Sequence, residues 1–513
     1  MHLRASLHDP AFVLGSPADS LTARPAAQVA SLAFALALFT IALRLPNFGD
    51  PTYHIDEAFY LYVGQAMRDG AMPYAEVWDR KPAGLFFLYA LFPEAGAIYW
   101  YQAVAALFAW ATAFTLALIA SAFASRFAAG VVGVLYLALI GALAGGGGQS
   151  PVFYNLFIAF AALLVLRGAL DRTSGVRSRS DYAAMLLCGL ALTFKPTALP
   201  EGIFLGLVLL WNRWRISRST RSVALHGLRL TSCAFVPTAL IWVTFAWLGH
   251  FGDYWFATMQ SIFLTQAPQP GASATRLVWL AHITWLPAVL ALCGLAILAR
   301  RASSRLMHDV FLAAFVGGWL AAAFAGFLLI ANFYDHYALP LASILAVSSA
   351  PLYDRRGTGP LLAVLASSYL LLASGFPAGQ MERKAAAQAG YAEATTMIAR
   401  HIGDGCLFVY DVTPALYLSF NGCPSNKYAF PEHLSNQREA DAIGASPLAA
   451  LRTALDRKPA VVVTSVSPSI STPNASTRSA LERELAAHYR KAGETALRDV
   501  VGRQEIAIWA RVE

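Results

Sequence analysis

A series of long apolar runs divides the sequence, and these runs restrict the fold more than any other feature. Each run approaches the length that an α-helix needs to cross the hydrocarbon core of a bilayer, about 20 residues. Hydrophobic residues make up 57% of the chain and charged residues only 13%, whereas soluble domains carry about 25% charged residues. A single soluble globule could not bury this much apolar surface. We therefore predict a polytopic α-helical membrane protein with about eleven spans, at residues 28–45, 97–122, 127–144, 152–168, 182–194, 197–212, 224–248, 278–299, 310–331, 337–352 and 359–376.

Arginine residues indicate how the chain is oriented in the membrane. If the N-terminus is cytoplasmic, every predicted inner loop contains arginine, and the outer loops at 145–150 and 332–336 contain neither lysine nor arginine. This is the asymmetry that cytoplasmic loops generally show. The inner-loop residues are Arg126, Arg167, Arg172, Arg177, Arg179, Arg213, Arg215, Arg218, Arg221, Arg300, Arg301, Arg305, Arg355 and Arg356. The net charge of +8 thus lies mainly in short loops, which argues for anionic lipid as the partner and against nucleic acid.

The composition changes near residue 377, where charged residues become frequent. We predict a transmembrane domain at residues 1–376, with a long first outer loop at 46–96, and a small soluble α/β domain at 377–513. With an odd number of spans and a cytoplasmic N-terminus, this last domain lies on the outer face of the membrane. Within it, the residue pattern predicts strands at 406–410, 460–466 and 505–512 and an amphipathic helix at 478–493.

Cysteine and glycine patterns add two smaller expectations. Cys406 and Cys423 lie in the polar C-terminal region and could form a disulfide in an oxidising compartment, or stay free. No CxxC motif occurs in the sequence, so there is no zinc or haem signature of that kind. The run of four glycines at 145–148 predicts a flexible turn at the outer face. It does not predict a phosphate-binding loop, because no Lys-Ser/Thr pair follows it.

Two adjacent carboxylates, Asp56 and Glu57, follow the first predicted span. Tyr53, Phe59 and Tyr60 are their neighbours in the sequence. An apolar environment desolvates a carboxylate and raises its pKa, and ionisable groups at membrane depth usually have a function. A solvated pair in a surface loop is the alternative. We interpret Asp56 and Glu57 as candidate catalytic carboxylates.

Cationic side chains occur at three further places in the predicted outer loops. Arg80 and Lys81 are adjacent in the first loop, Lys195 separates two apolar runs, and His336 lies between two strong spans. Cationic donors of this kind suit a phosphate group. The alternatives are headgroup binding by a peripheral lysine, a snorkelling anchor at Lys195, and an ordinary polar interfacial residue at His336. All of these positions fall on the outer face by an argument that used only arginines, so we predict that they share one site.

Four segments resemble a known family. They are DEAFYLYVGQAMRDGAMPYAEVWDRKPAGLFFLYAL at 56–91, KPTAL at 195–199, the HY-x-LP element at 336–340, and FVYDVTPALYLSFNGCPSNKYAFPEHL at 408–434. The sequence is similar at these places to the GT-C glycosyltransferases, in particular to the bacterial relatives of protein O-mannosyltransferases and of the lipid A aminoarabinose transferase. The resemblance spans most of the chain in order, and its first-loop motif is the most specific part.

The resemblance implies an inverting transfer of a sugar from a polyprenyl-phosphate donor to a hydroxyl acceptor at the periplasmic face. Asp56 corresponds to the first-loop aspartate that acts as base or orients the acceptor, and Glu57 to its acidic neighbour. Lys81, Lys195 and His336 correspond to positions near the lipid phosphate. Arg80, next to Lys81, is assigned to the same phosphate.

The sequence departs from the family at the start of the fourth span. An acidic residue is expected there, and Asn155 stands in its place. This affects the acceptor side of the site, for which Tyr74 and Asp335 are the other candidates. Some relatives use a divalent metal, but no tight spacing of His, Asp and Glu in this sequence points to a metal site, so the metal is left open.

Two other functions fit the same topology. One is a transporter or flippase for lipid-linked sugars, which would place polar residues at mid-membrane and often shows repeat symmetry. The other is a non-catalytic envelope assembly protein that uses the outer domain to bind a partner. The sequence identifies neither the sugar nor the acceptor, which could be a lipid, a glycan or a protein.

Overall fold

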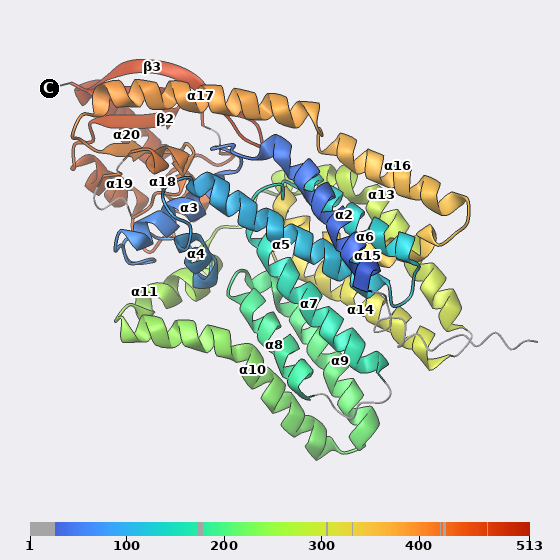
Figure 1. The fold of residues 1–513 in the computed structure, drawn as a ribbon. Coiled ribbons are helices and arrows are strands. Elements are labelled where there is room, and N and C mark those ends of the chain that lie inside the picture. The colour runs from blue at the N-terminus through green and yellow to red at the C-terminus, as the bar shows by residue number, and fades with distance from the viewer. Residues whose placement is uncertain are drawn as a thin grey trace, which may run out of the picture.

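The protein is a helical bundle with a small sheet domain at one end (Figure 1). The computed structural model describes residues 26–171, 178–303, 306–330, 332–420, 422–423, 427–468 and 470–512. Three of the arginines used to orient the chain, Arg172, Arg177 and Arg305, lie outside the described residues.

Each predicted span coincides with one helix. These helices are α2 (Ala26–Arg44), α5 (Ala97–Ala120), α6 (Arg126–Ala142), α7 (Ser150–Leu170), α8 (Ser178–Leu192), α9 (Leu199–Ser217), α10 (Thr220–Trp247), α13 (Pro270–Ala302), α14 (Met307–Leu328), α15 (Leu339–Tyr353) and α16 (Thr358–Ala373). Seven helical segments of the described chain are long and apolar enough to cross a membrane. The chain is therefore a multi-pass membrane protein, while the number of eleven crossings stays a prediction because several of the helices are shorter or less apolar.

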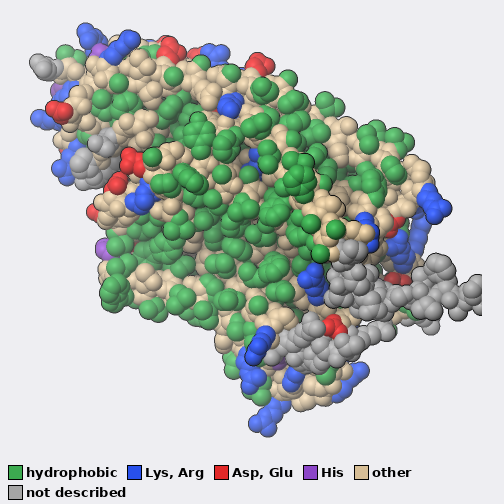
Figure 2. All heavy atoms as spheres, in the orientation of Figure 1, with side chains coloured by type: hydrophobic (Ala, Val, Ile, Leu, Met, Phe, Trp, Pro, Cys, Tyr) green, Lys and Arg blue, Asp and Glu red, His purple; other side chains and the backbone are tan. Residues whose placement is uncertain are grey.

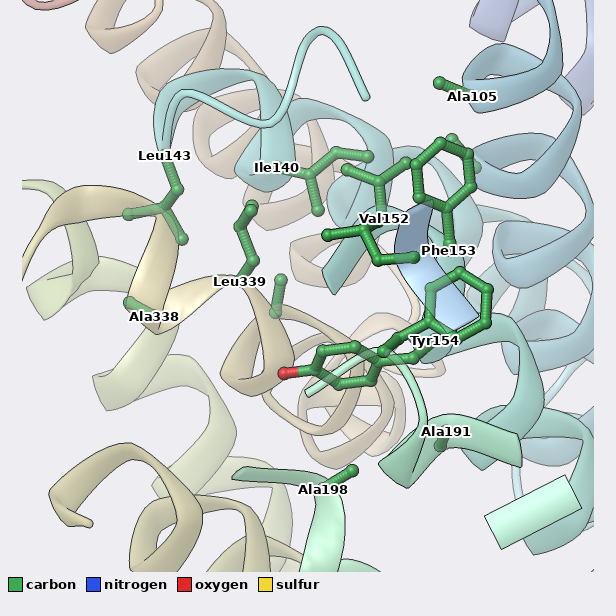
Figure 3. Close-up of a cluster of buried hydrophobic side chains, with 14 of the residues drawn as sticks. Ala105, Ile140, Leu143, Val152, Phe153, Tyr154, Ala191, Ala198, Ala338 and Leu339 are labelled. Carbon is green, nitrogen blue, oxygen red and sulfur yellow. The ribbon is translucent and has the colours of Figure 1, made fainter. Parts of the chain in front are cut away.

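Helix α15 lies at the centre of the bundle, with every one of its side chains buried. Close packing depends on small residues here: a Cβ added at Gly294 of α13 would lie 2.0 Å from the Ser348 carbonyl of α15. Small residues let neighbouring helix backbones approach in a membrane. Figure 3 shows Ile140, Val152 and Leu339 converging from α6, α7 and α15 in one apolar cluster.

The outer surface of the bundle is apolar where lipid would contact it. Phe34, Leu38 and Ile41 of α2 are exposed. Figure 2 shows hydrophobic side chains across the middle of the visible face, with Lys and Arg side chains gathered toward its ends. This distribution matches a belt of apolar surface between two polar ends.

The segment predicted as the first outer loop contains two short helices. They are α3 (Ile55–Arg68) and α4 (Ala83–Ala90), and they lie between the bundle and the sheet domain (Figure 1). The two helices pack closely because Gly64 of α3 contacts the backbone of Tyr89 in α4. Short connecting elements complete this end of the bundle: η1 (Leu45–Asn47), η2 (Pro196–Ala198), α11 (Phe251–Trp255), η3 (Phe256–Gln260), α12 (Ser261–Leu264) and η4 (Asp335–Ala338).

The C-terminal region forms a four-stranded sheet with helices on it. The strands β1 (Leu407–Val409), β2 (Val461–Ser465), β3 (Tyr489–Arg498) and β4 (Arg503–Arg511) lie in the order β1-β2-β4-β3, with β1 and β2 parallel and the other pairs antiparallel. The helical elements are α17 (Ala378–Ile402), η5 (Pro414–Leu418), α18 (Pro431–Ser435), η6 (Gln437–Glu439), α19 (Pro447–Leu455) and α20 (Ala475–His488). Cys406 and Cys423 are joined by a disulfide, with their Cα atoms 4.7 Å apart.

One element of this domain differs from the prediction. The expected helix at 478–493 ends at His488, and the chain continues as the edge strand β3. Only two residues of β3, Tyr489 and Leu497, are fully buried. The strand therefore lacks the regular apolar alternation by which strands are recognised in a sequence.

Candidate active site

Four of the predicted site residues meet at the end of the bundle beside the sheet domain. Asp56 lies in the first turn of α3, Lys81 precedes α4, Lys195 precedes η2, and His336 lies in η4. Asp56 Oδ1 is 3.3 Å from Lys81 Nζ, and Asp56 Oδ2 is 3.6 Å from His336 Nε2. Segments more than 250 residues apart in the chain thus contribute to one buried charged cluster.

The local sequence explains how Asp56 is presented. His54 is the N-cap of α3, and its Nδ1 accepts a hydrogen bond from the Asp56 amide at 3.1 Å. Such a cap satisfies one of the amides that a helix N-terminus leaves without a partner. The positive end of the helix dipole favours a negative charge in this first turn.

Asp56 is held in its charged form. Burial alone would raise the pKa of Asp56, but the ammonium of Lys81, with His54, His336 and Lys195 nearby, holds that pKa well below its ordinary value. Burial lowers the pKa of His336 well below its ordinary value. At neutral pH the cluster therefore contains an Asp56 carboxylate and a neutral His336 imidazole, which can still donate one hydrogen bond.

Glu57 does not join this cluster, although it follows Asp56 in the sequence. It is fully buried, and neither carboxylate oxygen receives a hydrogen bond of normal geometry from the described residues. It packs against the glycine run, where a Cβ added at Gly147 would lie 2.0 Å from Glu57 Oε2. Burial raises the pKa of Glu57 to about 8. Glu57 is thus mainly protonated at neutral pH, unlike its neighbour.

The predicted phosphate ligands differ in whether they form ion pairs with carboxylates of the protein. Lys81 Nζ lies 3.3 Å from both Asp56 and Asp79, and Arg80 forms an ion pair with Glu439 of the sheet domain. Lys195 instead lies over the ring of Tyr337, 4.0 Å from its centroid, and forms no ion pair with a described carboxylate. Burial lowers the pKa of Lys195 to about 7.

The three acceptor-side candidates lie in other surroundings. Tyr74 is buried and donates to the Lys81 carbonyl at 2.8 Å, so it supports the segment that carries Lys81. Asn155 donates to the Leu339 carbonyl at 3.1 Å, which ties α7 to α15. Asp335 accepts from Trp279 Nε1 at 3.2 Å. No ion pair or hydrogen bond joins any of the three to Asp56 in the described chain.

Several residues of the site were not anticipated from the sequence. Gln149, which follows the glycine run, lies 2.8 Å through Nε2 from His54 Nδ1 and 3.4 Å from Asp56 Oδ2. His54 lies two residues before Asp56, but histidine is not one of the usual N-cap residues, so the sequence did not indicate this cap. Gln149 carried no signal of its own, because a polar residue after a glycine run is ordinary in a loop.

The sheet domain also contributes to the site. Phe430 lies 5.0 Å from the Lys81 ammonium, measured to its ring centroid, and Glu439 pairs with Arg80. Glu432 is a largely buried carboxylate whose pKa is raised by burial and by Glu439. The segment 427–439 therefore covers the first outer loop, and the Trp78 amide donates to the Lys427 carbonyl at 2.8 Å.

His54, Asp56 and His336 form a buried group that could hold a metal ion by ligand type, with their ligand atoms within 4.8 Å of one another. The surroundings of the group oppose this use. The lone pair of His54 Nδ1 already faces two hydrogen-bond donors, the Asp56 amide and Gln149 Nε2, and is not free for a metal. The Lys81 ammonium already pairs with Asp56, and a divalent cation beside it would meet strong repulsion. We therefore derive no step of the chemistry through a metal.

Comparisons with known proteins identify the fold. No protein-family model and no curated protein matches the sequence. Among solved structures, ArnT from Cupriavidus metallidurans bound to undecaprenyl phosphate is similar with a TM-score of 0.63 and 16% identity, covering 94% of this chain and 98% of that one. The apo form of the same protein gives a TM-score of 0.61 and 15% identity, covering 93% and 97%. The oligosaccharyltransferase AglB from Archaeoglobus fulgidus gives 0.50 and 10% identity, covering 85% and 69%. The chain has the GT-C glycosyltransferase fold, as the sequence resemblance predicted.

Proposed function

We propose that the protein is an inverting glycosyltransferase that moves a sugar from a polyprenyl-phosphate donor to a hydroxyl acceptor at the periplasmic face of the inner membrane. One observation carries the proposal: the ionised Asp56 lies between Lys81 and His336 at the end of the apolar bundle that adjoins the sheet domain. A carboxylate beside cations, next to lipid, is what a membrane-bound phosphodiester substrate requires. The fold supports this, since ArnT has been solved with undecaprenyl phosphate.

The chemistry needs a base and a stabilised leaving group. The acceptor oxygen forms a bond to the anomeric carbon from one side while the bond from that carbon to the phosphate oxygen breaks on the other, which inverts the configuration. The acceptor proton goes to Asp56, and the bond electrons leave with the polyprenyl phosphate. General-base help of this kind contributes about 10²- to 10⁴-fold.

Asp56 is a weak base while Lys81 neutralises it. The low pKa of Asp56 arises from the surrounding cations, against the effect of burial. A bound phosphate attracts these cations too, so its arrival weakens their hold on Asp56 and raises its basicity. Donor binding thus prepares the base, and Asp56 stays unreactive in its absence.

Lys195 is the best placed cation for the donor phosphate, because it forms no ion pair with a described carboxylate and only the more distant Asp56 attracts it. His336 can donate a hydrogen bond to the same group, while Lys81 and Arg80 lie nearby with carboxylate partners of their own. Preorganised cations at a developing phosphate charge are usually a large part of such catalysis. The acceptor side, for which Asp335, Tyr74 and Asn155 are candidates, would be approached from the periplasm beneath the sheet domain.

The test is turnover by the purified full-length protein in nanodiscs with a polyprenyl-phosphate sugar and a panel of lipid, glycan and peptide acceptors. The wild type should release polyprenyl phosphate and glycosylate one acceptor class. Asp56→Asn should be inserted and folded but inactive. Full turnover by Asp56→Asn would refute the catalytic assignment. Movement of labelled donor across vesicles without transfer would instead favour the transporter.

A further inference from the structure

The glycine run between α6 and α7 is fixed by an arginine from α2. Arg44 donates through Nη1 to the carbonyls of Gly146 and Gly147, at 2.9 and 3.0 Å, and through Nη2 to the Gly145 carbonyl at 3.0 Å. Arg44 is only 7% exposed. Hydrogen bonds from a buried charged group to three successive carbonyls hold the backbone in one conformation. The segment is thus not the free turn that its composition suggests.

The glycines are required by what packs on them. A Cβ at Gly147 would lie 2.0 Å from Glu57 Oε2, and one at Gly148 would lie 2.4 Å from the Tyr89 hydroxyl. That hydroxyl donates to the Gly148 carbonyl at 2.8 Å. The run therefore lets buried side chains of the first outer loop lie directly against backbone.

Gln149 ends this fixed segment and is fully buried. Its Nε2 lies 2.8 Å from His54 Nδ1 and 3.4 Å from Asp56 Oδ2. The orientation of the amide follows from the histidine: His54 Nδ1 already accepts from the Asp56 amide, so its lone pair faces donors, and the amide must present nitrogen to it. His54 then carries its proton on Nε2.

We propose that Gly145–Gln149 is a positioning element of the active site, in which Arg44 fixes the backbone and Gln149 fixes the orientation of His54 and of the Asp56 carboxylate. Gln149 is a positioning residue because it acts through Asp56 and touches no reacting atom in this role. The inference rests on the proposed function for its kinetic consequences. The contact by which Gln149 holds His54 does not depend on that function.

The kinetic test compares Gln149→Leu, His54→Ala and the double variant with a change at a matched buried glutamine. The control is Gln380 of α17, which donates to the Ser374 carbonyl at 3.1 Å. Gln149→Leu should lower kcat about 10- to 100-fold while the donor KM stays nearly unchanged. The double variant should lose less than the product of the two single losses, because both side chains act on Asp56 and coupled residues are not additive. Gln380→Leu should leave kcat unchanged. Additive losses, or an equal effect of Gln380→Leu, would overturn the proposal.

Gln149→Glu provides a rescue test that a merely structural role would not produce. The ionised carboxylate accepts where the amide donates and repels Asp56, whereas the protonated form donates as the amide does. The rate relative to wild type should therefore recover as the pH falls from about 8 to about 5, since burial beside Asp56 raises the pKa of the introduced carboxyl. A relative rate independent of pH would contradict the role of Gln149 as donor.

A measurement without turnover separates this inference from the proposed function. Modification of His54 by diethyl pyrocarbonate, followed by mass spectrometry on the intact protein in nanodiscs, should be several-fold faster in Gln149→Leu than in wild type or Gln380→Leu. If the wild type transfers no sugar, the proposed function fails while this result still supports the positioning role. An unchanged rate of His54 modification in Gln149→Leu would overturn the positioning role whatever the turnover.

Discussion

Asp56 and Glu57 are adjacent in the first turn of α3, and their carboxyl groups lie in opposite electrostatic environments. Asp56 contacts Lys81 and His336, while Glu57 is enclosed by the glycine run and makes no ion pair with the described residues. Cations lower the pKa of Asp56 against the effect of burial, and burial raises that of Glu57 to about 8. Pairs of carboxyl groups whose pKa values diverge in this way mark separate roles in a site.

The first prediction follows from this divergence. Glu57→Gln should keep most of the activity and the thermal stability at pH 7, because the amide has the shape and the neutrality of the protonated carboxyl. Asp56→Asn, the matched isosteric change one residue earlier, should lose at least about 10²-fold in kcat. Turnover and thermal unfolding of the two variants, measured side by side, check this. Loss of activity in both to the same degree would show that Glu57 acts as a charged group.

The second prediction concerns pH and Lys195. Burial lowers the pKa of Lys195 to about 7 in the free protein, so its charge is present below that pH and is lost above it. Affinity for a singly charged polyprenyl phosphodiester should weaken by up to about tenfold per pH unit as the pH rises from 7. Lys195→Arg, which stays charged, should bind with little dependence on pH. Titrations by isothermal calorimetry at pH 6 and 9 distinguish the wild type from Lys195→Arg. If the affinity of the wild type does not change across this range, Lys195 is excluded as the phosphate ligand.

The third prediction concerns the packing of the glycine run, and a second glycine in the same part of the chain serves as its control. Gly147→Ala places a Cβ 2.0 Å from the buried Glu57 carboxylate, whereas a Cβ at Gly141 of α6 meets nothing within 4 Å. Gly147→Ala should destabilise the protein by about 1–3 kcal/mol through overpacking and should lower kcat by moving α3. Gly141→Ala should be neutral or stabilising by about 0.4–1 kcal/mol. Thermal unfolding and turnover of both variants give the comparison, and equal behaviour of the two would contradict the fixed packing of the glycine run.

The fourth prediction concerns the contact between Arg80 and Glu439, which joins the first outer loop to the sheet domain. Their side chains are 25% and 9% exposed. Glu439→Gln should destabilise the folded protein by about 1–3 kcal/mol, since it leaves a largely buried guanidinium without its counter-charge. The combined exchange of Arg80→Glu and Glu439→Arg should restore part of the loss.

Glu505 supplies the control for this pair. It lies 3.5 Å from Arg503, and both side chains are 63% exposed. Exposed pairs of this kind contribute little, so Glu505→Gln should leave thermal unfolding and turnover unchanged. If it destabilises the protein as much as Glu439→Gln, the Arg80 contact has no special part in docking the sheet domain.

The fifth prediction is that metal removal leaves turnover intact. His54, Asp56 and His336 have the ligand types for a metal, but Lys81 pairs with Asp56 and Gln149 contacts His54. Dialysis against a chelator, with metal content followed by plasma mass spectrometry, should not change the rate. Loss of activity that zinc or manganese restores would show that the group binds a metal in place of these contacts.

The sequence predicted most of the bundle and missed part of the sheet. Apolar runs such as residues 97–122 and 310–331 correspond to helices α5 and α14, because a lipid-facing helix must be apolar along its whole length. Strand β3 was missed because only Tyr489 and Leu497 are fully buried. A solvated edge strand can carry a sequence that also suits a helix.

The sequence predicted that four residues of the candidate site lie near one another, but it did not predict their partners. The membrane orientation inferred from the loop arginines placed Asp56, Lys81, Lys195 and His336 on the same face of the membrane. The structure brings these four residues together. The partners of these residues could not be predicted. Gln149 reaches His54 only because Arg44 fixes the intervening backbone, and that is a tertiary contact with no sequence pattern.

Two other long-range contacts have a consequence for the folding of the chain during its synthesis. The Thr52 hydroxyl donates to the Arg498 carbonyl, 446 residues later, and the Val500 amide donates to the Tyr53 carbonyl. The loop that carries Asp56 leaves the ribosome well before the hairpin of β3 and β4, which follows it by more than 400 residues. In a nascent chain this loop therefore lacks these contacts until the hairpin has been made. Under the proposed function, the base reaches its final position only after β3 and β4 have folded against the loop.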